Sequence, residues 1–216
     1  MRNACTPLLM VLLAGCASPA ADEAALKARF EAMVRSGFQA NGPVTLARLT
    51  QDETQKLCSD PAQAAGKDFE AARQRIERIN LATIQWPADG RYLGDWKQGE
   101  QIAQSGRGLT WTDPASGPGV ANGGNCYNCH MIDRKEISFG TIGPSLWNYG
   151  KLRGVADPAS AAAEPVVKYT WGKLWNSKAY NACSNMPRVG HMGILTEAQL
   201  RDVMALLLDP KSPVTQ

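Results

Sequence analysis

The fold of this chain is decided by the stretch Cys126-Tyr127-Asn128-Cys129-His130. It has the Cys-x-x-Cys-His pattern, in which both thiols add to the vinyl groups of haem and the imidazole binds the iron. The spacing suits that chemistry, because one helical turn presents both sulfurs to the same porphyrin edge while the histidine points at the metal. The motif therefore predicts one covalently bound haem c, held by Cys126, Cys129 and His130.

Two other kinds of site use closely spaced cysteines. A thioredoxin-like redox pair would need a βαβ context, which the sequence does not offer. A zinc site would need a second pair of ligands at matching spacing, and Cys58, Cys183 and His191 do not supply one. Haem attachment is the interpretation that fits the motif.

Length and composition describe an ordinary globular chain. Its 216 residues suffice for one domain and a substantial extension. Hydrophobic residues make up 44% and charged residues 20%, which argues against disorder. The formal charge is only +3 and no basic stripe appears, so nothing favours nucleic acid as a partner.

Residues 1–20 look like a bacterial signal peptide, with Arg2 before an apolar core at residues 7–13 and small residues after it. The apolar run is far shorter than the ~20 residues of a membrane-spanning helix. Two cleavage positions are open. Leu13-Ala14-Gly15-Cys16 resembles a lipobox, in which Cys16 would carry lipid, whereas cleavage before residue 21 would leave no lipid. We expect a periplasmic protein that attaches to a membrane only if Cys16 is lipidated.

Export also affects the remaining cysteines. Beyond the signal peptide the chain has Cys58, Cys126, Cys129 and Cys183. Since two of these belong to the haem motif, Cys58 and Cys183 are an even remainder in an oxidising compartment, where a disulfide is the default expectation. Buried free thiols, or pairing with a partner subunit, are the alternatives.

Residues 21–89 are predicted to form a helical extension. Apolar residues recur at helical spacing over about 21–37 and again over about 65–80. A short helix between them is expected to begin at Thr50, with Glu53 completing a capping box, and to end near Cys58.

Residues 90–216 are predicted to form the haem domain. Helices are expected at about 95–105 and within the segment 165–182, around Trp171, Leu174 and Trp175, with a Gly-rich loop at 106–125. The clearest helix is the last one, which Thr196 and Gln199 cap and Pro210 ends. Its predicted buried face consists of Leu200, Val203, Met204 and Leu207.

The iron needs a ligand on the face opposite the histidine, and methionine is usual in high-potential carriers. Met186, His191 and Met192 are the candidates. Seven further side chains could line the haem or bond its propionates, and sequence spacing does not choose among them: Tyr127, Trp147, Tyr149, Arg153, Trp171, Trp175 and Arg188.

Two further segments resemble class I cytochromes c. Met186-Pro187 lies in a loop before the terminal helix, and residues 142–146 read Ile-Gly-Pro-Ser-Leu. The resemblance implies an all-α class I cytochrome c domain with Met186 as the second axial ligand. It also implies that the carbonyl of Pro144 accepts a hydrogen bond from Nδ1 of His130 and so fixes the imidazole tautomer.

The segments 124–130, 140–146, 185–191 and 194–210, taken in order, resemble the SoxX family. SoxX is the small cytochrome subunit of the SoxAX complex. The resemblance covers about the last 120 residues of the chain. The extension is less diagnostic, although it resembles the additional N-terminal region of some SoxX proteins.

Membership of this family would imply an L-cysteine S-thiosulfotransferase, in which thiosulfate is coupled oxidatively to a cysteine of the SoxY carrier. The sulfur chemistry would occur on a SoxA-type subunit, and this chain would pass electrons to a downstream cytochrome without catalytic residues of its own. A freestanding exported cytochrome between respiratory partners is the alternative. A haem-bearing sensor, which needs an open sixth position, is a third possibility.

The predicted disulfide has a direct chemical test. Alkylation of the denatured, non-reduced holoprotein should leave Cys58 and Cys183 unmodified, because neither thiol would be free. Mass spectrometry of the alkylated chain counts the modified residues, and two alkylated cysteines would contradict the disulfide.

Overall fold

The computed structural model describes residues 19–42, 44–113 and 122–216. Residues 1–18, with Cys16 and nearly all of the predicted signal peptide, lie outside the described residues, as does part of the predicted loop, residues 114–121. The chain divides into two compact units, Met1–Gln39 and Ala40–Gln216. Residues 40–89 of the predicted extension therefore belong to the same unit as the haem motif.

The described residues form helices and loops, with no β-strand among them, so the all-α fold class is confirmed. Within 19–42, 44–113 and 122–216, no helix is both long enough and apolar enough to cross a membrane.

The first unit contains α1, Pro19–Gly37, which confirms the helix predicted there. Three residues of its predicted apolar face are exposed: Leu26 by 62%, Phe30 by 60% and Met33 by 58%. Periodicity therefore located the helix without determining what its apolar face contacts.

The second unit begins with one 3-10 turn and three helices. These are η1 Leu46–Leu49, α2 Glu53–Ser59, α3 Pro61–Ala64 and α4 Phe69–Leu81. The predicted capping box of Thr50 and Glu53 is wrong. Asp52 caps α2: its carboxylate accepts from the Gln55 amide at 2.8 Å, and the Gln55 side chain accepts from the Asp52 amide at 2.9 Å. Aspartate is at least as good an N-cap as threonine, so the same spacing works two residues later.

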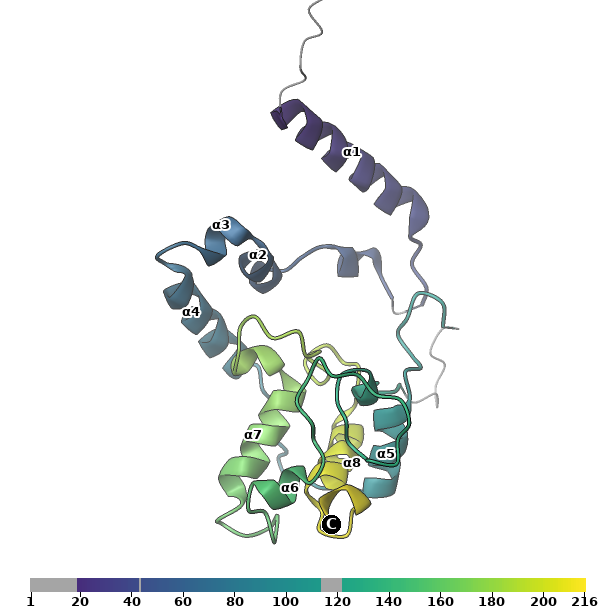
Figure 1. Ribbon diagram of the computed structural model, residues 1–216, viewed down its shortest axis with the longest axis vertical. Helices are drawn as coiled ribbons and strands as arrows, with labels where there is room; N and C mark the ends of the chain where they lie inside the picture. Colours follow the sequence, from purple (N-terminus) through teal and green to yellow (C-terminus); the bar gives the residue numbers. More distant parts are fainter. Residues whose placement is uncertain (1–18, 43, 114–121) are drawn as a thin grey trace, which may run out of the picture. The chain divides into compact units, whose positions relative to one another are not determined.

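The haem motif lies among the remaining elements. These are α5 Trp96–Gln104, η2 Cys126–Asn128, α6 Tyr149–Leu152, α7 Glu164–Trp175, η3 Ser177–Ala179, α8 Glu197–Leu208 and η4 Pro213–Thr215. Figure 1 shows α5, α6 and α7 around α8, and α8 contacts all three. The predicted capping box of Thr196 and Gln199 is confirmed at the start of α8.

The core of this unit is built on α8. All four residues of its predicted face are buried, as are Ala205, Leu206 and Leu208, so the buried surface is wider than the periodicity indicated. A helix that is buried nearly all round has neighbours on several sides. The chain on the N-terminal side of α5 also reaches this core, since Nε1 of the fully buried Trp171 in α7 donates to the carbonyl oxygen of Gln85 at 2.8 Å.

Helices α5 and α8 cross at Gly99. A Cβ at this position would overlap the carbonyl oxygen of Asp202 and approach Cβ of Leu206 to 3.1 Å. The amide of Gly94 donates to the carbonyl oxygen of Arg201 at 2.8 Å, just before α5 begins. Only a residue without a side chain lets the two backbones come this close.

Substituting Gly99→Ala should therefore destabilise the protein by about 3 kcal/mol, the upper part of the usual range for overpacking, because the methyl group meets backbone atoms. Gly37→Ala is the matched control, since a Cβ there would have no atom of the described residues within 4 Å. Chemical denaturation of both holoproteins measures the difference, and equal unfolding midpoints would contradict the close crossing.

Candidate haem site

The Cys-x-x-Cys-His segment forms a single tight turn. The amides of Cys129 and His130 both donate to the carbonyl oxygen of Cys126, at 3.1 and 2.9 Å. The turn is attached to the C-terminal end of α5, because the Gly124 amide donates to the Ile102 carbonyl at 2.8 Å and the Asn125 amide donates to the Ser105 carbonyl at 2.9 Å. Helix α5 therefore positions the motif.

Tyr127, which lies between the two cysteines, also holds the turn. Tyr127 is only 6% exposed, and its hydroxyl oxygen accepts from the Asp133 amide at 3.1 Å. Burial raises the pKa of Tyr127 to about 12, so its hydroxyl is neutral at physiological pH. The side chain of Tyr127 thus fixes the turn from the core side.

The two cysteines of the motif are free thiols and partly buried. Burial raises the pKa of the Cys126 thiol to about 11, and the neighbouring Cys129 adds to the effect. Both sulfurs are available for thioether bonds to a haem.

The imidazole of His130 is fixed by its neighbours. Its Nδ1 lies 2.7 Å from the carbonyl oxygen of Pro144. Because a carbonyl can only accept, Nδ1 carries the proton, and Nε2 keeps the lone pair that a metal requires. Gly143 leaves the ring its space, since a Cβ there would overlap the imidazole. The Gly143 amide also donates to the Cys129 carbonyl at 2.8 Å, which ties this segment to the motif.

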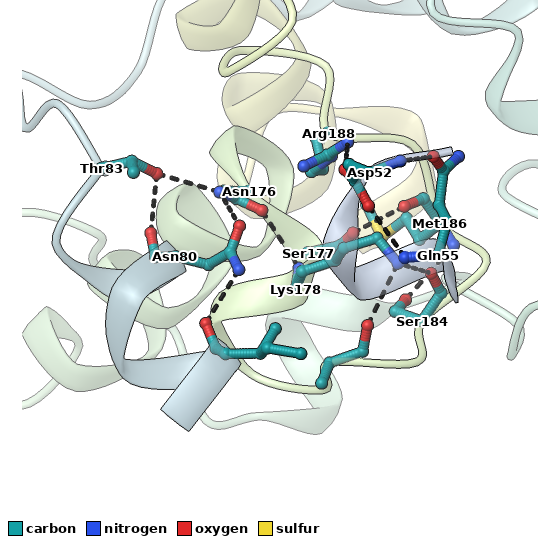
Figure 2. Close-up of polar contacts among 12 residues, drawn as sticks. Asp52, Gln55, Asn80, Thr83, Asn176, Ser177, Lys178, Ser184, Met186 and Arg188 are labelled. Carbon is teal, nitrogen blue, oxygen red and sulfur yellow. Dashed lines mark hydrogen bonds and ion pairs between the residues drawn. The ribbon is translucent and has the colours of Figure 1, made fainter. Parts of the chain in front are cut away.

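The three candidates for the second axial ligand differ in burial. Met186 is half-buried and packs against the main core, whereas His191 is exposed and Met192 is 50% exposed. The backbone of Met186 is bonded on both sides: its carbonyl oxygen accepts from the Ser177 hydroxyl at 2.5 Å, and its amide donates to the Ser184 hydroxyl at 3.2 Å (Figure 2). Of the three, Met186 is the one whose side chain is partly buried and packs against the main core.

Cys58 and Cys183 form a disulfide in the structure, with their Cα atoms 5.4 Å apart. Cys58 lies near the end of α2, and Cys183 lies three residues before Met186. The bond therefore connects the extension to the methionine loop, residues 182–188.

One buried donor near this loop lacks a partner. Trp175 is 8% exposed, and its Nε1 makes no hydrogen bond to any residue that the structure describes. A Cβ at Gly190 would meet the Trp175 ring, and the His191 amide donates to the Trp175 carbonyl at 2.9 Å, so this indole lies against residues 190–191, which follow Met186 closely in the chain. A buried N–H without an acceptor is costly, and a haem propionate would supply the acceptor. The residues present fit a haem. Tryptophan spacing alone could not have selected Trp175.

The helical fold, the attachment turn and the oriented histidine define a c-type cytochrome domain. Residues 114–210 match the family model for cytochrome c, which implies a covalently bound haem c and a role in electron transfer. The chain is also 37% identical, over 170 residues, to an uncharacterised lipoprotein of Aquifex aeolicus, an alignment that spans 79% of this chain and 75% of the relative. The chain belongs to the family of that lipoprotein and carries a class I cytochrome c domain.

Gly143→Ala should disturb the histidine without touching the motif itself. The added methyl group would push the imidazole away from the Pro144 carbonyl, so we expect a loss of about 1–3 kcal/mol in stability and a weaker histidine–iron bond. Absorbance spectroscopy of the holoprotein, followed during denaturation, measures both. Pro144→Ala retains the accepting carbonyl and should have the smaller effect; a larger effect of Pro144→Ala would contradict this account.

Proposed function

We propose that this chain is the electron-transfer subunit of a SoxAX-type L-cysteine S-thiosulfotransferase. Cys126 and Cys129 would hold the haem through thioethers, with His130 and Met186 as the two axial ligands. The observation that carries the proposal is the order of four linked motifs, 124–130, 140–146, 185–191 and 194–210, which resemble SoxX. The cytochrome c domain found over 114–210 supports the electron-transfer part.

The reaction served by this subunit releases two electrons. A cysteine thiol of a SoxY-type carrier and thiosulfate form one S–S bond, giving a cysteine S-thiosulfonate, one proton and two electrons. The bond would form on a SoxA-type subunit, so the enzymatic activity belongs to the complex and no catalytic residue is expected here. The electrons would pass singly through this chain to a downstream cytochrome.

The residues of this chain would bind and orient the cofactor. The haem, when bound, supplies the one-electron couple of its iron. His130 is held by Pro144 in the tautomer that binds iron through Nε2. Met186 as the second iron ligand would favour the reduced iron and would leave no open position, which suits a relay better than a sensor. Trp175 would donate to a propionate, which would give its buried indole N–H an acceptor.

The second candidate function is a freestanding, membrane-anchored electron carrier. The Aquifex relative is described as a lipoprotein, and Cys16 of this chain lies in a possible lipobox. Lipidation at Cys16 would place the protein at the periplasmic face of a membrane. Such an anchor suits a freestanding carrier and is also compatible with a SoxAX-type subunit.

Met186→Ala tests the axial ligand. Loss of the thioether should remove the methionine–iron(III) charge-transfer band and lower the reduction potential by about 0.1 V or more, a modest part of the ~0.8 V over which axial ligands set haem potentials. Met192→Ala is the matched control, since that side chain is 50% exposed. An unchanged spectrum and potential in Met186→Ala would overturn the assignment.

A pull-down of the tagged protein from cells grown on thiosulfate tests the complex. The SoxAX proposal expects a second, larger cytochrome to copurify in equal amount and the pair to produce thiosulfonate on a carrier cysteine. A stable monomer that exchanges electrons rapidly with an oxidase would instead favour the freestanding carrier. Intact-mass measurement of the same sample reads the haem and any acyl chain.

A further inference from the structure

The extension contacts the methionine loop through a small apolar cluster of its own. Leu57 of α2 and Ile76 of α4 pack with Ala182, and all three are buried. Phe69 and Ala72 of α4 lie against the same cluster. This cluster is separate from the main core, so the extension has a packing surface that is specific for the start of the loop.

The Cys58–Cys183 disulfide crosses the same contact and makes it covalent. The bond closes a loop of 125 residues. In the chain-entropy model a loop of this length gives a large stabilisation of the folded arrangement. The extension and the methionine loop are thus held together even where the non-covalent contacts open.

Arg188, two residues after Met186 in the chain, forms a charged pair with Asp52 of the extension. Nη2 of Arg188 lies 2.7 Å from Oδ2 of Asp52, and the arginine side chain is only 16% exposed. Partial burial raises the pKa of Asp52, but the hydrogen bonds from Gln55 and Arg188 outweigh it, so the pKa is lowered and the carboxylate is charged at neutral pH. Asp52 therefore has two roles: it caps α2 and holds Arg188.

Polar contacts lead from α4 to the backbone of Met186 (Figure 2). The side-chain amide of Asn176, which is fully buried, donates to Asn80 and to Thr83, both at 2.9 Å. The next residue, Ser177, donates to the Met186 carbonyl. The position of this carbonyl thus depends on contacts that begin in the extension.

Lys178 completes these contacts. Its side chain is buried, and Nζ donates to the carbonyl oxygens of Ala182 and Ser184 at 3.0 and 3.4 Å. Its amide donates to the side chain of Asn176 at 3.2 Å. A buried ammonium that bonds two carbonyl oxygens of one loop fixes the path of the chain between them.

We propose that residues 52–83 form a clamp that holds the methionine loop, 182–188, in the position from which Met186 binds the iron. The inference rests on the proposed axial role of Met186. Local opening of a loop costs less free energy than global unfolding, and contacts that exist only in the closed loop raise that cost. Asp52 and Asn80 of the clamp are positioning residues in this sense, because they act on the ligand through the loop. Lys178 of η3 supports the same loop from the other side of Asn176.

Imidazole binding to the oxidised holoprotein measures this opening, because imidazole reaches the iron only when Met186 leaves it. Asp52→Asn removes the negative charge that faces Arg188, while the asparagine side chain can still cap α2. We expect imidazole to bind about tenfold faster in this variant, which corresponds to ~1.4 kcal/mol in the cost of opening the loop. The charge-transfer band should persist in the absence of imidazole.

Asp89→Asn is the matched control. Asp89 also pairs with an arginine, Arg201, at 2.8 and 3.0 Å, but this pair lies outside the clamp. The same substitution there should leave the rate of imidazole binding unchanged even if it lowers the unfolding midpoint. Equal acceleration in both variants would mean a general loss of stability and would overturn the clamp.

The covalent part is tested with the double variant Cys58→Ser/Cys183→Ser, and with the wild-type holoprotein after phosphine reduction in case the variant folds poorly. Either should bind imidazole at least tenfold faster. Wild-type rates in both the disulfide-free protein and Asp52→Asn overturn the clamp while leaving the axial assignment intact. An unchanged spectrum in Met186→Ala overturns the axial assignment, and the clamp with it.

Discussion

Helix α5 approaches α8 at Gly99 so closely that no side chain fits between the two backbones. The attachment turn with both cysteines and His130 is hydrogen-bonded to the C-terminal end of α5, and the loop with Met186 leads into α8. The crossing of these helices therefore determines where the two halves of the haem site lie. The other contacts of the site act within the arrangement that this backbone packing allows.

Within that arrangement, the two sides of the iron are held by different means. On the histidine side, the contacts are local in sequence: Pro144 and Gly143 lie within fourteen residues of His130 and need only a short loop to reach it. On the methionine side, the contacts are distant in sequence, since Asp52 pairs with a residue 136 positions later and Asn80 with one 96 positions later. The histidine position is thus a property of one segment, whereas the methionine position depends on the tertiary structure.

This difference explains which features could be predicted from the sequence. The motif, the helix capped by Thr196 and its buried face, and the all-α class follow from local spacing, and the residue pattern was enough. The start of α2 was misplaced because two capping patterns overlap at Thr50 and Asp52. The interaction of Lys178 with the loop and the unpaired donor of Trp175 left no trace in spacing, because each depends on which distant segments pack together. A buried lysine in particular reads as a surface residue in sequence.

The disulfide has a consequence for maturation. Four thiols, at positions 58, 126, 129 and 183, could pair in three ways in an oxidising compartment. Once thioether formation consumes Cys126 and Cys129, Cys58 and Cys183 have only each other within this part of the chain. If haem attachment precedes oxidation, Cys58 and Cys183 form the native disulfide without any later exchange of disulfides. If oxidation comes first, Cys126 and Cys129 can form wrong disulfides.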